Sequence, residues 1–141
     1  NVAAHTGAQC VGWNGHRIGD NYSAAGNMLV GEETVDAMAR TFEESTGLSL
    51  SERLLQSLEA GQAAGGDKRG RQSAALLIVD EEDYPLLDLR VDEHEDPVKE
   101  LRRIYTQAEK ELIPRMTLMP TKKNINDRKS MEKIGLIEED K

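Results

Sequence analysis

The sequence has a single cysteine, fewer basic than acidic residues (18 against 26) and no long apolar run. Cys10 is the one cysteine among 141 residues, which excludes an internal disulfide framework and fits a reducing cytoplasm. The formal net charge of −8 argues against nucleic acid and anionic membrane surfaces as partners. No apolar run approaches the length of a transmembrane helix. The sequence therefore predicts a protein of the cytoplasm that binds neither nucleic acid nor membrane.

Familiar catalytic and cofactor motifs are also missing. There is no Gly-x-Ser-x-Gly elbow, no His-Glu-x-x-His, no phosphate-binding loop and no dinucleotide fingerprint, so we predict no cofactor. Cys10 has no cation or helix end beside it in the sequence, and we interpret it as a small core residue and not as a nucleophile. His5, His16 and His94 lack the spacing of metal ligands, so no metal site is predicted.

Alternating and periodic apolar residues outline an α+β fold. Strands are predicted at residues 2–4 and 9–13, with a hairpin turn at Asn14-Gly15 and returning strands at 16–20 and 22–29. The apolar run 74–79 predicts a strand covered on both faces, and 87–91 alternates cleanly between apolar and charged residues. This order predicts mixed or antiparallel sheets with helices on one face.

Three helices are predicted between and after these strands. Residues 32–46 carry apolar side chains at helical spacing and end before Gly47. Ser49-x-x-Glu52 is a capping box for a second helix, and Asp96-Pro97 opens a third, which Pro114 ends. The sequence thus divides into a folded domain over residues 1–113 and a tail or docking arm over 114–141.

The chain's densest positive charge lies on a glycine-rich loop, residues 65–73. Glycines 65, 66 and 70 permit a tight loop, which leads into the strand at 74–79. Arg69 and Arg71, with Asp67 between them and the helix, could bind a carboxylate or phosphate at the rim of a site. Alternatively, the two arginines pair with acidic side chains of the protein itself.

A second set of candidates lies on the strands. Asp88, Arg90 and Asp92 share one strand face, where they form either an ion ladder or, for Arg90 and Asp92, part of a pocket with Asp67 and Arg69. Asn27 could donate a hydrogen bond to an oxyanion or could simply serve packing. His5 follows a strand end and is either a site residue or a turn histidine bonded to backbone.

Several of these segments together resemble a known family. Gly-Gly-Asp-Lys-Arg-Gly-Arg-Gln-Ser-Ala-Ala-Leu-Leu at 65–77 is similar to the signature of the domain of unknown function 1028 family. The resemblance continues at Ala-Ala-His-Thr-Gly (3–7), at Tyr-Ser-Ala-Ala-Gly-Asn-Met-Leu (22–29), and at Asp-Leu-Arg-Val-Asp (88–92) followed by Asp-Pro (96–97).

The resemblance implies a fold and an activity. That family is placed by fold with the N-terminal-nucleophile (Ntn) hydrolases, so the chain would form the C-terminal portion of a four-layer α-β-β-α sandwich. Because Asn1 is not a nucleophile of the required kind, the nucleophile would lie on a missing N-terminal segment or on a partner chain. We expect an amide-bond hydrolase for which this chain supplies binding groups, or a non-catalytic binding or assembly protein on the same fold. A homo-oligomer is expected in either case.

Overall fold

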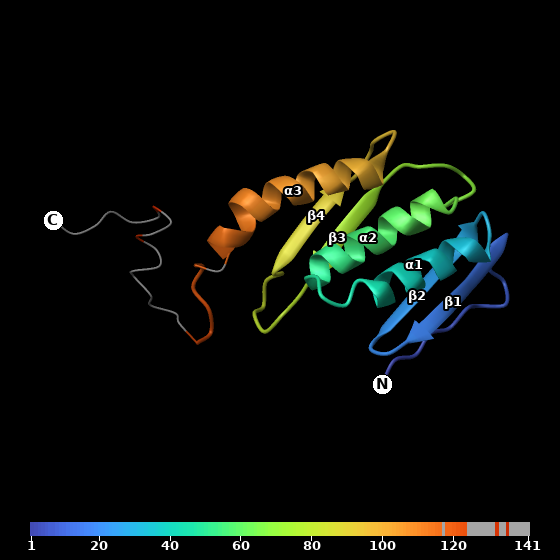
Figure 1. Cartoon of the computed structure of the whole chain (residues 1–141), viewed down its shortest axis with the longest axis horizontal. Coiled ribbons are helices and arrows are strands. Elements are labelled where there is room, and N and C mark those ends of the chain that lie inside the picture. The colour runs from blue at the N-terminus through green and yellow to red at the C-terminus, as the bar shows by residue number, and fades with distance from the viewer. Residues whose placement is uncertain (117, 124–131, 133–134, 136–141) are drawn as a thin grey trace.

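The structure is a computed structural model, and it describes residues 1–116, 118–123, 132 and 135. It confirms an α+β fold, in which three helices lie on one side of two separate antiparallel hairpins (Figure 1). In chain order the elements are β1 (Trp13–Gly19), β2 (Tyr22–Leu29), α1 (Glu32–Glu44), α2 (Leu50–Ala63), β3 (Ala74–Ile78), β4 (Leu87–Val91) and α3 (Pro97–Met116).

The first hairpin turns at Asp20-Asn21, and the predicted turn at Asn14-Gly15 is wrong. Gly19 pairs with Tyr22, and Asn21 takes a positive φ of 62°, which asparagine tolerates in tight turns. The Asn14 amide instead donates to the carbonyl oxygens of Cys10 and Gly12. Residues 1–12 contain no strand, so the strands predicted at 2–4 and 9–13 are also wrong, and Cys10 is exposed and not part of the core.

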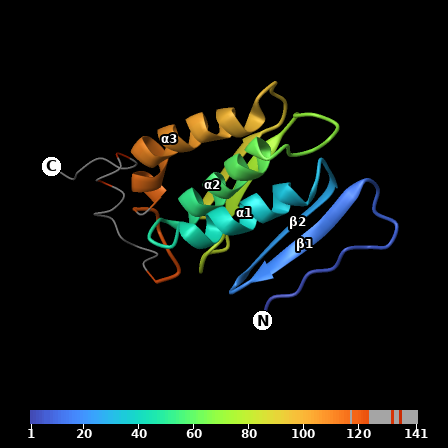
Figure 2. The ribbon, with the colours of Figure 1, turned by 45° about the vertical axis from the view of Figure 1, so that its right-hand side comes forward.

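The first two helices follow the prediction closely. Helix α1 covers the first hairpin and lies beside α2, as both views show (Figures 1 and 2). The predicted capping box of α2 forms in part: Ser49 Oγ accepts the backbone N–H of Glu52 at 3.3 Å. The Glu52 carboxylate itself turns toward α3, where it meets Arg102.

The third helix begins at Pro97 as predicted but continues past Pro114 to Met116. A proline removes one backbone donor, and in the last turn of a helix that loss does not prevent two further residues from keeping helical geometry. Helix α3 packs on the second hairpin, and its Leu101 and Tyr105 are fully buried in one core with Leu76 and Leu89 of the hairpin and Leu55 of α2.

Strand β4 has the predicted register, with Leu87, Leu89 and Val91 buried and Asp88 and Arg90 exposed. The prediction for its partner β3 is wrong, because this strand is covered on one face only. Leu76 is 3% exposed, whereas Leu77 is 57% exposed. The physical reason is that helices α2 and α3 cover one side of β3, and among the described residues nothing packs on the other side.

The segment after α3 returns to the acidic turn between β3 and β4. Tyr84 Oη donates to the carbonyl oxygen of Pro120 at 2.9 Å, and Lys122 Nζ donates to Asp83 Oδ1 at 2.7 Å. Most of the predicted tail, 114–141, lies outside the described residues. None of the helices in the described ranges combines the length and the apolar character that a membrane span requires.

Candidate functional site

The glycine-rich loop 65–73 is tightly shaped, as predicted. Gly65, Gly66 and Gly70 have φ values of 127°, 64° and 112°, a region that side-chain-bearing residues rarely adopt. The loop is fastened to the end of β2, because Val30 N donates to Gly66 O and Lys68 N donates to Met28 O. The end of α2, the end of β2 and the start of β3 therefore meet at this loop.

Asp67 closes the loop on itself. Its Oδ1 accepts the backbone N–H of Arg69 at 2.8 Å, and both carboxylate oxygens accept from the Arg69 guanidinium, with Nη2 to Oδ2 at 2.5 Å. The side-chain hydrogen bonds from Arg69, together with its backbone N–H, lower the pKa of Asp67 to about 2. The Arg69 fork is thus already occupied by a carboxylate of the same loop.

Arg71 is held less completely. Its Nη1 lies 3.2 Å from Asp96 Oδ1, at the start of α3, and its side chain is 45% exposed. A guanidinium carries five N–H donors, and this contact uses one nitrogen. Arg71 can therefore accept a further anionic partner without losing its present one.

Arg71 borders two polar hollows. One, of about 460 Å³, is lined by two arginines and two acids, together with Gln72 and Ser73; the charged residues are Asp67, Arg69, Arg71 and Glu93. The other, of about 520 Å³, is lined by Lys99 and Arg103 and also by three acids, Glu95, Asp96 and Glu100. Both are open and polar, which suits a small charged ligand that stays partly hydrated.

The turn after β4 holds the loop 65–73 through two hydrogen bonds. His94 N donates to Gln72 O at 2.9 Å, and Gln72 Nε2 donates to Glu93 Oε2 at 3.1 Å. The His94 ring accepts the backbone N–H of Asp96 at Nδ1. Gln72 and Glu93 were missed at the level of sequence, because neither residue type nor spacing shows that this turn reaches the loop.

The structure brings Asp67, Arg69 and Arg71 together but places the other candidates elsewhere. Arg90, on the exposed face of β4, pairs at 2.8 Å with Asp92, the residue after the strand, and neither lines the hollow.

Asn27 and His5 lie outside the hollow as well. Asn27 lies on β2 opposite Asn14. It precedes Met28, whose carbonyl oxygen accepts the backbone N–H of Lys68 in the loop. His5 lies in the exposed N-terminal segment, next to Thr6, whose hydroxyl meets His16 Nδ1 at 2.6 Å. Within the described part of the chain, His, Cys, Asp and Glu side chains form no cluster of three that could hold a metal ion.

Comparisons with known proteins agree on one family. No curated protein matches the chain. The crystal structure of protein SPO2555 from Silicibacter pomeroyi, which is described with the family model DUF1028, superposes on this chain with a TM-score of 0.74 at 28% sequence identity. The match covers 88% of this chain but 55% of the other, so this chain spans about half the length of that protein. The model named "Family of unknown function (DUF1028)" matches residues 1–101, and the chain therefore belongs to the DUF1028 family.

Proposed function

We propose that the chain supplies the anion-binding part of an amide-bond hydrolase of the Ntn type, whose nucleophile lies on polypeptide outside residues 1–141. The observation that carries the proposal is Arg71: a half-exposed guanidinium, held at one nitrogen by Asp96, at the border of two polar hollows. A carboxylate bound there can be gripped by two parallel hydrogen bonds.

The contact between Arg69 and Asp67 indicates which of the two loop arginines binds the anion. An arginine whose fork is filled by a neighbouring carboxylate has little left for a ligand, so Arg69 shapes the rim and Arg71 binds. Asp67 and Glu93 place negative charge across the same hollow. A substrate that carries both signs, such as an amide with a free carboxylate and a nearby ammonium group, fits this lining better than an inorganic anion.

A thermal-shift comparison tests the binding part of the proposal. Acetate, free amino acids and phosphate are each added to the parent and to Arg71→Ala, Arg71→Lys and Arg90→Ala. A carboxylate at roughly 100 times its Kd adds about 2.7 kcal/mol to the stability of the parent. The gain is expected to disappear in Arg71→Ala, to shrink in Arg71→Lys and to persist in Arg90→Ala, whose ion pair is of the same kind but lies outside the hollow.

One outcome of the thermal-shift comparison would contradict the anion site. If no anion stabilises the parent and Arg71→Ala simply melts lower, Arg71 serves only its pair with Asp96, and the anion site is wrong.

The hydrolase part is tested by the intact mass and the N-terminal residue of every chain in the purified natural protein. A processed Thr, Ser or Cys at a chain start supports the enzyme, because its own amine can act as the base. Its absence favours the second candidate, a binding or assembly protein on the same fold. Light scattering on the same material tests the expected homo-oligomer, and fractionation of cells tests the cytoplasmic location.

A further inference from the structure

The two hairpins lie next to each other without forming one sheet. Along the described strands, no Cα atom of β2 lies within 8 Å of a Cα atom of β3. Paired strands are about 4.8 Å apart, so a strand inserted between two others separates them by about 10 Å. Figures 1 and 2 show the two hairpins on the same side of α1 and α2, with β2 and β3 as their facing members.

A hollow of about 350 Å³ fills this space, and we call it the β2–β3 slot. Residues 22–25 of β2 form one wall and residues 75–77 of β3 form the other. Helices α1 and α2 form the floor with four apolar side chains and one hydroxyl, that of Ser57, which donates to the Met38 carbonyl oxygen; the apolar residues are Met38, Phe42, Leu54 and Leu58. Among the described residues, none that lines the slot is charged, in contrast to the two hollows beside Arg71.

In the part of the chain that the structure describes, no strand pairs with the facing edges of β2 and β3 along the slot. Strand β2 pairs with β1, and within the described residues its other edge forms a bridge only between Leu29 and Asp67, which lie outside the lining of the slot. Strand β3 pairs only with β4 among the described elements. Its sequence, Ala-Ala-Leu-Leu-Ile, contains none of the charges or prolines with which edge strands usually avoid further pairing.

We propose that the β2–β3 slot receives an extended segment of polypeptide from outside residues 1–141. The segment pairs with the edge of β3, lays apolar side chains on Phe42, Leu54 and Leu58, and joins the two hairpins into one sheet. Its own sequence alternates apolar with small or polar residues and carries no charge on the side facing the helices, because the floor offers no partner for one.

The related structure provides a source for such a segment. The match to protein SPO2555 covers 88% of this chain and 55% of that protein, so a little under half of the relative has no counterpart among residues 1–141. This proposal rests on backbone edges and apolar lining and not on Arg71, so either proposal can fail without the other.

Peptides that tile the unmatched part of protein SPO2555 are the probes. Each is added at millimolar concentration to the isotope-labelled chain, and backbone amide exchange is followed residue by residue. At least one peptide is expected to slow exchange at residues 75–77 by tenfold or more. Two further versions of that peptide carry N-methyl groups on its odd-numbered or on its even-numbered residues. Only one of the two versions should lose the protection, because in a paired strand only alternate N–H groups face β3. A scrambled peptide of the same composition is the control and should give no protection.

Two results would overturn the proposal. In one, no tiling peptide slows exchange at residues 75–77. In the other, exchange there is already slow in the peptide-free chain and accelerates on dilution, which shows that a second copy of the chain fills the slot.

Discussion

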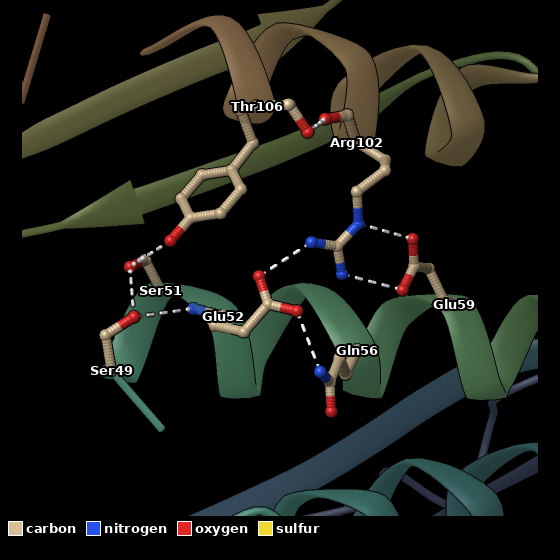
Figure 3. A network of polar contacts seen from close by, with 8 residues as sticks. Ser49, Ser51, Glu52, Gln56, Glu59, Arg102 and Thr106 are labelled. Carbon is tan, nitrogen blue, oxygen red and sulfur yellow. Dashed lines mark hydrogen bonds and ion pairs between the residues drawn. The ribbon is translucent and has the colours of Figure 1, made fainter. Parts of the chain in front are cut away.

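Arg102 and Glu59 join helices α3 and α2 through two parallel hydrogen bonds, from Nε to Oε1 at 2.7 Å and from Nη2 to Oε2 at 2.8 Å (Figure 3). The third guanidinium nitrogen, Nη1, donates to Glu52 Oε2 at 2.6 Å. The side chains are partly shielded, with Glu52 21%, Arg102 28% and Glu59 36% exposed. The arginine therefore holds two turns of α2 against α3.

Replacing Arg102 with Met should destabilise the protein by about 1–3 kcal/mol, because two shielded carboxylates lose their partner while the aliphatic packing is kept. Urea unfolding measures the effect. The matched control is Arg103→Met, one residue along the same helix. Arg103 is 68% exposed and pairs with Glu100 within one helix, so its loss should cost under about 0.5 kcal/mol. Equal costs for the two variants would show that the contact across the helices adds nothing.

The same network predicts how stability depends on pH. The hydrogen bond from Arg102, helped by that from Gln56, lowers the pKa of Glu52 below its usual range. A carboxylate whose pKa is depressed by folding stabilises the protein above its unfolded pKa of about 4.3, and the contribution is lost as pH falls through the folded pKa. The free energy of unfolding should therefore fall below about pH 4 in the parent and fall less steeply in Glu52→Gln. Identical slopes would mean that Glu52 ionises alike in both states.

The helix signals were sufficient to predict α1 and α2 because they are local. The Ser49 hydroxyl caps the backbone N–H of Glu52 within one turn, so the pattern contains what this bond needs, whereas the Glu52 carboxylate binds the distant Arg102. The first hairpin was misplaced because Asn14-Gly15 and Asp20-Asn21 both suit a two-residue turn. The observed turn places β1 and β2 against α1, where Arg17 meets Asp36 at 2.5 Å and Tyr22 meets Glu43 at 2.6 Å, and such contacts between distant residues leave no mark in the local sequence.

Only the local part of the candidate site could be predicted from the sequence. Asp67, Arg69 and Arg71 lie within one loop, so their convergence followed from sequence proximity. The partner of Arg71 is Asp96, at the start of α3, and the arginine that binds two acids most closely, Arg102, has no distinguishing motif. Contacts between distant helices leave no local signal.

Leu89→Ala should cost about 2–5 kcal/mol, as truncation of a core leucine does. Leu89 is 7% exposed and lies opposite Leu76 in the sheet. Leu77→Ala is the matched control on the partner strand, because this leucine is 57% exposed and its truncation should cost under about 1 kcal/mol. Thermal or urea unfolding separates the two. Leu89→Asp should not fold at all, and a Leu89→Asp variant that melts like the parent would disprove the register of β4.

The contact between Tyr22 and Glu43 predicts that the Tyr22 hydroxyl is an unusually weak acid. Tyr22 Oη donates to Glu43 Oε1 at 2.6 Å, and this bond, with burial second, raises the pKa of Tyr22 to about 12. A raised pKa stabilises the fold below the unfolded value of about 10, and the contribution is lost as pH rises toward 12. NMR titration of the ring should show the shift, and Glu43→Gln should bring the pKa back toward 10. An unchanged pKa in that variant would assign the shift to burial alone.

The loop itself can be tested through Asp67, whose pKa is lowered to about 2. Such a carboxylate stabilises the fold above its usual pKa of about 3.9, and its contribution is lost as pH falls toward 2. Carbon NMR of the side-chain carboxyl group measures the titration directly. Arg69→Ala should raise the pKa substantially, because the guanidinium hydrogen bonds are the largest cause, yet leave it below 3.9, because the backbone N–H of residue 69 still donates to Oδ1.

Arg71→Ala is the control for that measurement, since Arg71 pairs with Asp96 and not with Asp67. It should leave the Asp67 titration nearly unchanged while altering anion binding. If Arg71→Ala moves the Asp67 pKa as far as Arg69→Ala does, the two arginines act on the loop as one unit. The division into a rim arginine and a binding arginine would then be wrong.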